Sequence, residues 1–528
     1  MKKNLLFIAL LIILTVCSKS LPVYADELTP ELTLSNNGKK GNLTDDSHYT
    51  SVKFNQNDTI TVSSKDGAPI HGLYISWDSQ PVAWVLTTDG GDISCGANGF
   101  LHEYIPLETP SASVTIHIPA DSVRVDCIRI FSDGDLPHDV QVWNPPCDRA
   151  DIMVVSSHSD DEILFFGGVL PTYSYLYDAD IQVVYMCEFW TTTKVREHEK
   201  LDGLWEAGIR NYPTCGNFYD KYAEDAKEAK KKYEYDSLVA FLVEEIREFQ
   251  PQVLVTHDIY GEYGHGFHIL TCQALMDAVE FAADGSMYPE SKELFGIWNT
   301  PKTYLHIFPA NTIKLDLHIP IEEDYAGRTA LEILKEAYKK HDSQQWCRFY
   351  VSDDYEHSCA DYGLYRTLVG PDTTNDLLCN LKTYKVQAVE EQARIEAEAA
   401  ALAAQKAEEE RLEAERIKEE QAKKEAEQKA EQERLAAEQK AEEERLAKEE
   451  QARQEIIRQA EEEKAALKAE QEALRATEAA GYTAEVKKLT EELDSLQTNN
   501  KLLLAGMILS LFALIGSLTA LVVTHHKK

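Results

Sequence analysis

The sequence is short of basic residues. Its 528 residues include 53 Lys and Arg against 90 Asp and Glu, so the formal net charge is −37. A chain of this charge repels the phosphates of nucleic acid, so we expect no nucleic-acid partner. The 44% hydrophobic content excludes a wholly disordered chain. Long apolar runs are lacking except near the two ends, which excludes a membrane protein with several spans.

Closely spaced cysteines are also lacking. The ten cysteines include no CxxC pair, so a zinc site built from cysteines is not predicted. Cys347 and Cys359 are near enough in sequence to pair, but nothing in the sequence requires a disulfide.

The two apolar runs predict a secreted and anchored protein. Residues 1–25 combine a positive start, an apolar run and small residues before Ala25, which is typical of a secretory signal peptide. Residues 502–523 carry no charge and would span about 33 Å as a helix, enough for one membrane crossing. The lysines of residues 524–528 favour a cytoplasmic tail. We therefore expect a single-pass cell-membrane protein with its N-terminal domains outside; a buried hydrophobic helix is the alternative for 502–523.

Residues 26–148 predict a small all-β sandwich of jelly-roll type. Apolar and polar residues alternate, as in strands, at 59–63, 73–77 and 114–118. The tryptophans of this region either belong to its core or stack on sugars: Trp77, Trp84 and Trp143.

Residues 149–385 predict a different architecture. Short apolar runs, typical of strands covered on both faces, lie at 152–155, 181–186 and 252–255. Helical patterns separate them, as at 237–249. This alternation predicts an α/β domain with a doubly wound, mostly parallel sheet. In such sheets ligands bind beyond the carboxyl ends of the strands.

Residues 386–500 predict a charged helical stalk. Up to residue 480 the segment contains no Pro or Gly, and Ala, Glu, Gln, Lys and Arg dominate it. Gln428–Glu438 is followed directly by a similar eleven-residue unit, Gln439–Glu449. Because leucines are sparse, a solvated single helix or a weak coiled coil is expected, and self-association at most weak.

The candidate catalytic and metal-binding residues follow two of the predicted strands. His158-Ser159-Asp160-Asp161-Glu162 crowds one imidazole and three carboxylates at a strand end, which suits zinc. An acidic helix N-terminus is the alternative for this pentapeptide. A second strand leads into His257-Asp258 and then Gly261–His268, where His265 and His268 are three residues apart. Two strand ends that each deliver histidine and carboxylate predict a shared zinc site.

At these positions the sequence resembles the PIG-L/LmbE-like zinc N-deacetylases. His158–Glu162 resembles their His-Pro-Asp-Asp-Glu signature, and Tyr263–His268 resembles their Tyr-Gly-His-x-x-His motif. Arg196 and Glu199, followed by Gly208, fit an Arg-x-x-Glu pattern with a helix-ending glycine. His341–Gln344 resembles a His-x-Ser-Gln motif near the family's C-terminal boundary. The resemblance covers about residues 151–345. Ser159 and Phe267 depart from the pattern, where the family commonly has Pro and Asp.

The resemblance implies a metal centre and a general base. It implies that His158, Asp161 and His268 hold Zn²⁺ and leave one position open for water. Asp160 is implied as the general base that takes a proton from that water.

The resemblance implies further roles around the metal. His265 would stabilise the oxyanion or protonate the leaving amine, and Tyr263 would be another oxyanion donor. Glu162 would orient a metal ligand. Arg196 would contact sugar hydroxyls or an anionic group; an ion pair with Glu199 is the alternative. Structural or supporting roles are expected for three other residues: His198, His257 and Asp258.

The sequence therefore predicts a cell-surface, membrane-anchored zinc hydrolase. By the resemblance it would remove the acetyl group from N-acetylglucosamine-type sugars of an envelope glycan or glycolipid. One alternative is a catalytically inactive glycan-binding protein on a helical stalk. Another is a structural protein whose main part is the stalk itself.

Overall fold

The computed structural model describes residues 24–322, 325–435 and 450–473. The chain divides into two compact units, Met1–Gln392 and Ala393–Lys528. Within the described residues no helix is both long and apolar enough to cross a membrane. The predicted transmembrane helix, cytoplasmic tail and nearly all of the signal peptide lie outside the described residues.

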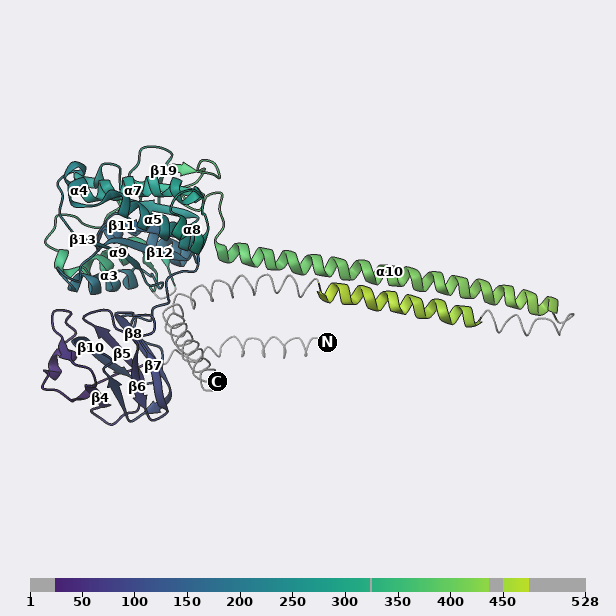
Figure 1. Ribbon diagram of the computed structural model, residues 1–528, viewed down its shortest axis with the longest axis horizontal. Coiled ribbons are helices and arrows are strands. Elements are labelled where there is room, and N and C mark those ends of the chain that lie inside the picture. The colour runs from purple at the N-terminus through teal and green to yellow at the C-terminus, as the bar shows by residue number, and fades with distance from the viewer. Residues whose placement is uncertain (1–23, 323–324, 436–449, 474–528) are drawn as a thin grey trace, which may run out of the picture. The chain divides into compact units, whose positions relative to one another are not determined.

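The first region of the first unit is a sandwich of two antiparallel sheets (Figure 1). One sheet has the order β1 (Glu27–Leu28), β10 (Val123–Phe131), β5 (Ile70–Trp77), β8 (His102–Ser111), with β3 (Val52–Phe54) also on β10. The other has the order β2 (Pro30–Leu34), β4 (Thr59–Ser64), β9 (Ser113–His117), β6 (Trp84–Thr88), β7 (Gly91–Cys95). A short 3₁₀ helix, η1 (Lys40–Leu43), connects β2 to β3.

The core of the sandwich follows from the alternating pattern. In β4, Ile60 and Val62 are fully buried while their neighbours are partly exposed. The three tryptophans are buried as well, with exposures of 0%, 2% and 7% for Trp77, Trp84 and Trp143. They are core residues, so the sugar-stacking alternative for them is wrong.

The second region of this unit is an α/β domain around a seven-stranded sheet. Its order is β13 (Thr214–Tyr219), β12 (Ile181–Glu188), β11 (Ile152–Ser156), β14 (Val253–Thr256), β15 (Lys302–His306), β19 (Asp361–Thr367), β16 (Thr312–Lys314). The first five strands are parallel to one another, β19 is antiparallel to β15, and β16 is antiparallel to β19 and so runs in the direction of the first five. This confirms the predicted mostly parallel sheet.

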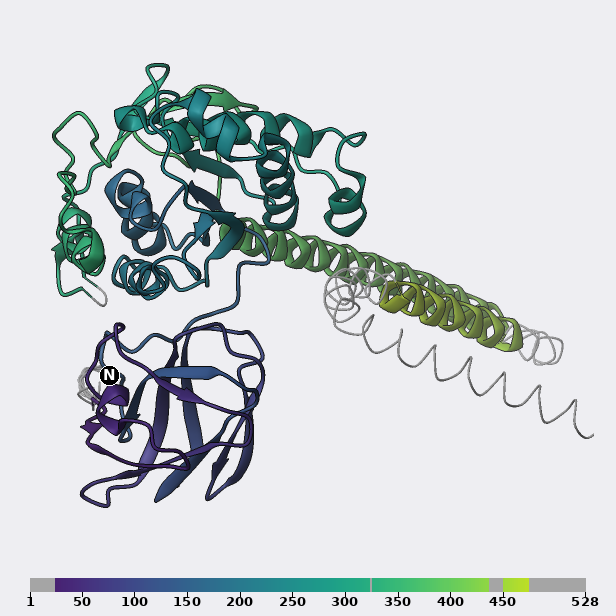
Figure 2. The ribbon, with the colours of Figure 1, turned by 60° about the vertical axis from the view of Figure 1, so that its left-hand side comes forward.

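Helices cover both faces of this sheet (Figure 2). Met153 and Val155 share a core with α4 (Ala226–Lys232), α5 (Tyr235–Phe249) and α7 (Gly266–Ala283). The alternate residues, Ile152 and Val154, share the opposite core with α2 (Asp161–Leu164), α3 (Val195–Glu206) and α9 (Ala330–Lys339). Both faces are therefore apolar, which is why the strands read as unbroken hydrophobic runs.

Shorter elements complete the domain. They are η2 (Gly167–Val169), η3 (Thr172–Leu176), α6 (Gly261–Gly264), α8 (Pro289–Phe295), β17 (Pro320–Ile321), β18 (Arg328–Thr329) and η4 (Asp342–Gln344). The nine cysteines in the described part of the chain are all free, including Cys347 and Cys359.

The strand order reverses next to β11. The chain runs from β11 outward through β12 to β13, then returns to β14 and continues to β15 on the other side. Ligands of doubly wound sheets bind at the carboxyl ends of the strands beside such a reversal. The fold thus places the ends of β11 and β14, with the predicted motifs, at the expected ligand position.

The described residues of the second unit are helical. Helix α10 (Tyr384–Leu435) begins in the first unit and continues into the second, and residues 450–473 form a further helix. Lys464 Nζ lies 3.7 Å from Glu410 Oε1, and the two helices run side by side (Figures 1 and 2). One straight helix would separate these residues by about 80 Å. The described residues of the predicted stalk therefore form two helical segments and not one straight helix, and the weak coiled coil stays a prediction.

Candidate active site

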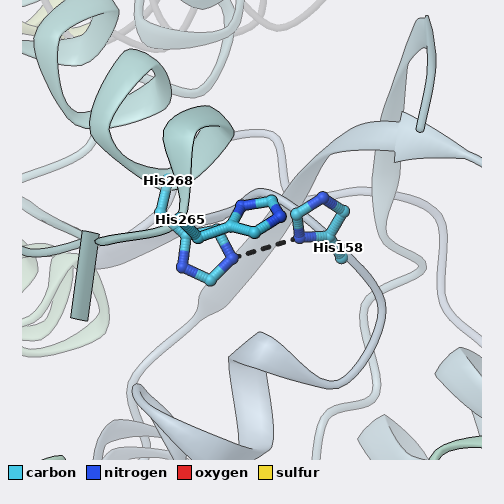
Figure 3. Close-up of side chains that lie close together, drawn as sticks. All are labelled: His158, His265 and His268. Carbon is cyan, nitrogen blue, oxygen red and sulfur yellow. Dashed lines mark hydrogen bonds between the residues drawn. The ribbon is translucent and has the colours of Figure 1, made fainter. Parts of the chain in front are cut away.

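Three predicted ligands converge at the reversal point of the sheet. His158 follows β11, Asp161 begins α2, and His268 lies in the first turn of α7. His158 Nδ1 is 3.0 Å from Asp161 Oδ2, and His268 Nε2 is 3.2 Å from the same oxygen. The two imidazole nitrogens are 3.2 Å apart (Figure 3). All three side chains are buried. The structure thus brings one nitrogen or oxygen of each residue to a common point.

This donor set fits a divalent metal such as zinc. Bonds of about 2.0–2.1 Å in a tetrahedral arrangement place ligand atoms about 3.3 Å apart, close to the separations found here. His268 Nδ1 is 2.7 Å from Glu262 Oε2. A proton held on that nitrogen leaves Nε2 unprotonated and facing the common point. On His158, Nε2 lies 3.5 Å from Asp220 Oδ1, so a proton placed there leaves Nδ1 free in the same way.

The charges of the cluster favour an ionised Asp161. Although burial opposes it, His268 and His158 hold the pKa of the Asp161 carboxyl well below its usual range. In turn, Asp161 raises the pKa of His158 to about 9, again against the effect of burial. In the metal-free site the two imidazoles share protons with the Asp161 carboxylate. A metal bound by these atoms would displace those protons, so metal binding would release protons.

Asp160 stands beside the three ligands without belonging to them. Its Oδ1 is 3.1 Å from Arg196 Nη2, and its backbone N–H donates to Glu162 Oε2 at 2.7 Å. Burial raises the pKa of Asp160 to about 6, and Arg196 opposes this rise. Its φ of +121° is unusual for a residue with a side chain, and such strain persists only where the surroundings hold it.

Two predicted roles need revision. The guanidinium of Arg196 donates to the Ser159 carbonyl and pairs with Asp160, whereas Glu199 accepts from Ser343 N and Oγ, each at 2.6 Å. The ion pair between Arg196 and Glu199 is therefore wrong. Glu162 holds the backbone of Asp160 and lies 3.1 Å from His341 Nε2 instead of orienting a metal ligand.

The carboxylate that supports a ligand is Glu262. Its side chain is fully buried and contacts three imidazoles, with oxygen–nitrogen distances of 3.1 Å to His257 Nδ1, 2.7 Å to His268 Nδ1 and 3.1 Å to His306 Nδ1. Because His257 Nε2 accepts from Ser157 N–H at 3.0 Å, its proton is on Nδ1 and points at Glu262.

Three residues of this site are not predicted from the sequence: Glu262, His306 and Asp220. His306 ends β15, and Asp220 directly follows β13. Both residues lie at the carboxyl ends of strands, where ligands of such sheets bind. They could therefore have been predicted by considering the ends of all the parallel strands and not of two only. Glu262 sits at φ +57° within the α6 turn, a backbone conformation that no residue pattern of this segment predicts.

His265 and Tyr263 line the other side of the cluster. The His265 ring lies 5.0 Å from His158 and 4.4 Å from His268, centre to centre. Burial, with these two histidines, lowers the pKa of His265 to about 2, so its imidazole is neutral. Its Nδ1 has no hydrogen-bond partner among the described residues. Tyr263 is 40% exposed, with its ring 5.7 Å from His265.

Phe267 takes the position where the resembled family commonly has Asp. Its buried ring stacks on Tyr233, with the ring centres 4.0 Å apart. At this position the site therefore has apolar packing in place of a charge.

The domain is a doubly wound α/β fold, and its histidine–carboxylate cluster lies where the strand order reverses. A cluster of this composition at this position suits metal-assisted hydrolysis. Residues 153–279 match the family model described as PIG-L, GlcNAc-PI de-N-acetylase. This part of the chain is a PIG-L domain, and the resemblance predicted from the motifs is confirmed.

Named relatives share parts of this domain. A 1D-myo-inositol 2-acetamido-2-deoxy-alpha-D-glucopyranoside deacetylase of Catenulispora acidiphila is 31% identical over 162 residues, which are 30% of this chain and 46% of the relative. A mycothiol S-conjugate amidase of Streptomyces coelicolor is 47% identical over 57 residues, 11% of this chain and 20% of that protein. The chain thus spans less than half the length of these curated relatives.

Among solved structures, the N,N'-diacetylchitobiose deacetylase from Pyrococcus horikoshii has a TM-score of 0.29 and 16% identity. The match covers 37% of this chain and 71% of that one.

Proposed function

We propose that this chain is a zinc-dependent hydrolase that removes the acetyl group from N-acetylglucosamine-type sugars. The observation that carries the proposal is the convergence of His158 Nδ1, Asp161 Oδ2 and His268 Nε2 to within 3.2 Å of one another. A fourth group, the Asp160 carboxylate, lies beside them and outside the ligand set. Bound zinc would polarise the amide carbonyl and lower the pKa of a water toward about 7.

The chain's own groups have distinct tasks in this proposal. Asp160 accepts the proton from the attacking water, and Arg196 keeps its carboxylate ionised and oriented. His265, as a neutral imidazole, has one N–H to donate in a hydrogen bond to the developing oxyanion, and the proton that Asp160 has accepted passes to the leaving amine. Tyr263 is half-exposed at the edge of the cluster, where its hydroxyl is available to the same oxygen.

The inactive glycan-binding alternative is less well supported. A general base has to lie beside the proposed ligands, as the Asp160 carboxylate does, whereas sugar binding alone requires no carboxylate there. The three tryptophans of the sandwich are buried, so they offer no surface on which a sugar could stack.

The location is a proposal that rests on the sequence alone. The apolar runs at 1–25 and 502–523 support an exported protein with one membrane anchor. Protease added to intact cells should release a fragment that contains residues 26–385. Complete protection of this fragment, in cells whose surface proteins are cleaved, would contradict the proposed location.

The activity is tested with the purified full chain in detergent, loaded with zinc. Candidate substrates are N-acetylglucosamine, N,N'-diacetylchitobiose and an N-acetylglucosaminyl inositol, with glucosamine as the blank. We expect acetate and primary amine to appear in equal amounts from at least one of them. Zinc-loaded protein that releases acetate from none of the N-acetylated sugars would refute the proposed function.

A further inference from the structure

The β-sandwich contacts one face of α3, the helix that carries Arg196. Three side chains of α3 lie at positions i, i+4 and i+7 and so share this face: His198, Asp202 and Trp205. His198 Nδ1 is 2.8 Å from Nε2 of His102 on β8. Asp202 Oδ2 is 3.0 Å from Nε2 of His48. The sandwich is therefore joined to the α/β domain by polar side chains as well as by apolar packing.

At the centre of this contact, His48 forms ion pairs with two carboxylates at once; we call this arrangement of Asp126, His48 and Asp202 the bridge. The two ring nitrogens of His48 face two carboxylates, with Nδ1 2.8 Å from Asp126 on β10 and Nε2 3.0 Å from Asp202 on α3. Although burial opposes it, Asp202 and Asp126 raise the pKa of His48 to about 10. The neighbouring His102 and His198 are buried and have lowered pKa values, so they remain neutral. One imidazolium thus links a carboxylate of the sandwich to a carboxylate of α3.

A metal ion is a poor explanation for this cluster. An imidazole binds a metal through a nitrogen lone pair that lies in the plane of its ring. The rings of His48 and His198 are stacked, 4.4 Å apart and only 7° from parallel. Two nearly parallel planes share no nearby point at which one ion could be ligated by both rings. The histidines therefore join the two regions directly.

The opposite side of α3 reaches the candidate active site. Arg196, on its first turn, donates to the Ser159 carbonyl and pairs with Asp160 at 3.1 Å. Glu199, one turn further, accepts two hydrogen bonds from Ser343 in the motif near the end of the domain. One helix therefore connects the sandwich to the proposed general base.

We propose that the β-sandwich is a positioning element of the catalytic unit. His48 of the sandwich binds Asp202 of α3 and so fixes the position of this helix. The helix in turn holds Arg196 against the Asp160 carboxylate. This inference rests on the proposed function for its effect on turnover. His48 and Asp202 are positioning residues, because each acts on the reaction through α3 and neither contacts the metal ligands.

The strained backbone of Asp160 makes this support necessary. With φ at +121° the residue adopts a conformation that is kept only by its surroundings. Arg196 is one of the two side chains that hold it, and Glu162 is the other. A small displacement of α3 moves Arg196 and releases one of these two restraints. Displacements of about 1 Å at a reacting group typically lower rates about 100-fold.

The test compares His48→Ala and Asp202→Asn with the full wild-type chain. We expect kcat to fall about 10- to 100-fold in each variant. The KM and the zinc content should stay within about twofold, because the ligands are untouched. The double variant should lose little more than the worse single variant, since both changes break one bridge. His117→Ala is the matched control, because the imidazole of this exposed sandwich histidine hydrogen-bonds to Thr87 of the neighbouring strand β6.

Hydrogen exchange gives a readout that does not depend on activity. In Asp202→Asn, which keeps the shape of the side chain, we expect the amides of residues 157–161 to exchange about 10-fold faster than in the wild type. A purely local role of the bridge would change exchange only at the sandwich contact and in α3.

The outcomes separate the two proposals. If the wild type releases no acetate but residues 157–161 exchange faster in the variant, the proposed function fails and the coupling through α3 stands. Unchanged exchange at residues 157–161 together with wild-type kcat would overturn the positioning role. Loss of zinc in parallel with loss of kcat would also overturn it, because the bridge would then act on the ligands or on folding.

Discussion

Replacement of Glu262 by glutamine should weaken zinc binding without removing any ligand. The buried Glu262 carboxylate faces three imidazole nitrogens and the backbone N–H of Asp258. Its shortest contact, 2.7 Å, is with Nδ1 of the proposed ligand His268. Glutamine has nearly the same shape, but one of its two oxygens becomes an NH₂ group that donates instead of accepting.

The size of the effect follows from these contacts. The carboxylate accepts from three donors, the Nδ1–H groups of His257 and His268 and the backbone N–H of Asp258, whereas an amide oxygen accepts about two. At least one of these three donors then faces an NH₂ group, which weakens the support of the His268 ring. Loss of such support typically lowers metal affinity 10- to 100-fold, which corresponds to about 1.4–2.7 kcal/mol. An unsatisfied buried donor also lowers the stability of the metal-free chain by about 1–3 kcal/mol.

The assay is a competition for zinc between the full chain and a chelator of known affinity. Glu245→Gln is the matched control, because it makes the same chemical change in another buried glutamate, on α5 and bonded to Thr214. We expect a weakened affinity in Glu262→Gln and an unchanged one in Glu245→Gln. A Glu262→Gln variant that binds zinc as tightly as the wild type would refute the supporting role of Glu262.

Three further predictions concern the base, the core and the pH dependence of stability. Asp160→Asn should keep its zinc but lose about 10²–10⁴-fold in turnover, because an amide cannot take the proton; zinc analysis beside turnover checks this. Asp372→Asn should lower the free energy of unfolding by about 3–5 kcal/mol in denaturant titrations, because it leaves the buried Lys302 ammonium unpaired. Burial raises the pKa of Glu245 from 4.5 to about 8, so between these values the folded chain holds a proton that the unfolded chain has lost. Stability should therefore fall as the pH rises through this window, by at most about 5 kcal/mol, and Glu245→Gln should remove that loss.

The sequence was sufficient to predict that these side chains converge, because their placement follows from topology; their role as metal ligands is what the family resemblance implies. His158 and His268 are far apart in the chain, but parallel strands bring their carboxyl ends to one edge of the sheet. The signature at residues 158–162 also separates Asp161, which reaches the common point, from Asp160, which does not. The alternation of apolar residues predicted the sandwich for the same kind of reason, since inward and outward positions follow a period of two.

Other parts of the site depend on contacts that no local pattern contains. Glu262 reaches three histidines only because its backbone adopts a φ of +57°, and this conformation depends on the surrounding turn. Asp202 and His48 are 154 residues apart in the sequence. Their pairing depends on how the β-sandwich docks against the α/β domain. Arg196 was predicted at the site, but its partner could be identified only once α3 was placed over the Asp160 turn.

Acetate release during a zinc titration of the metal-free full chain tests the central claim most directly. With an N-acetylglucosamine-type substrate, activity should be absent without zinc, rise in proportion to added zinc, and level off at one equivalent per chain. One equivalent is expected because His158, Asp161 and His268 form a single ligand set. Full activity of the metal-free chain, or one tightly bound equivalent of zinc without any acetate release, would contradict the account.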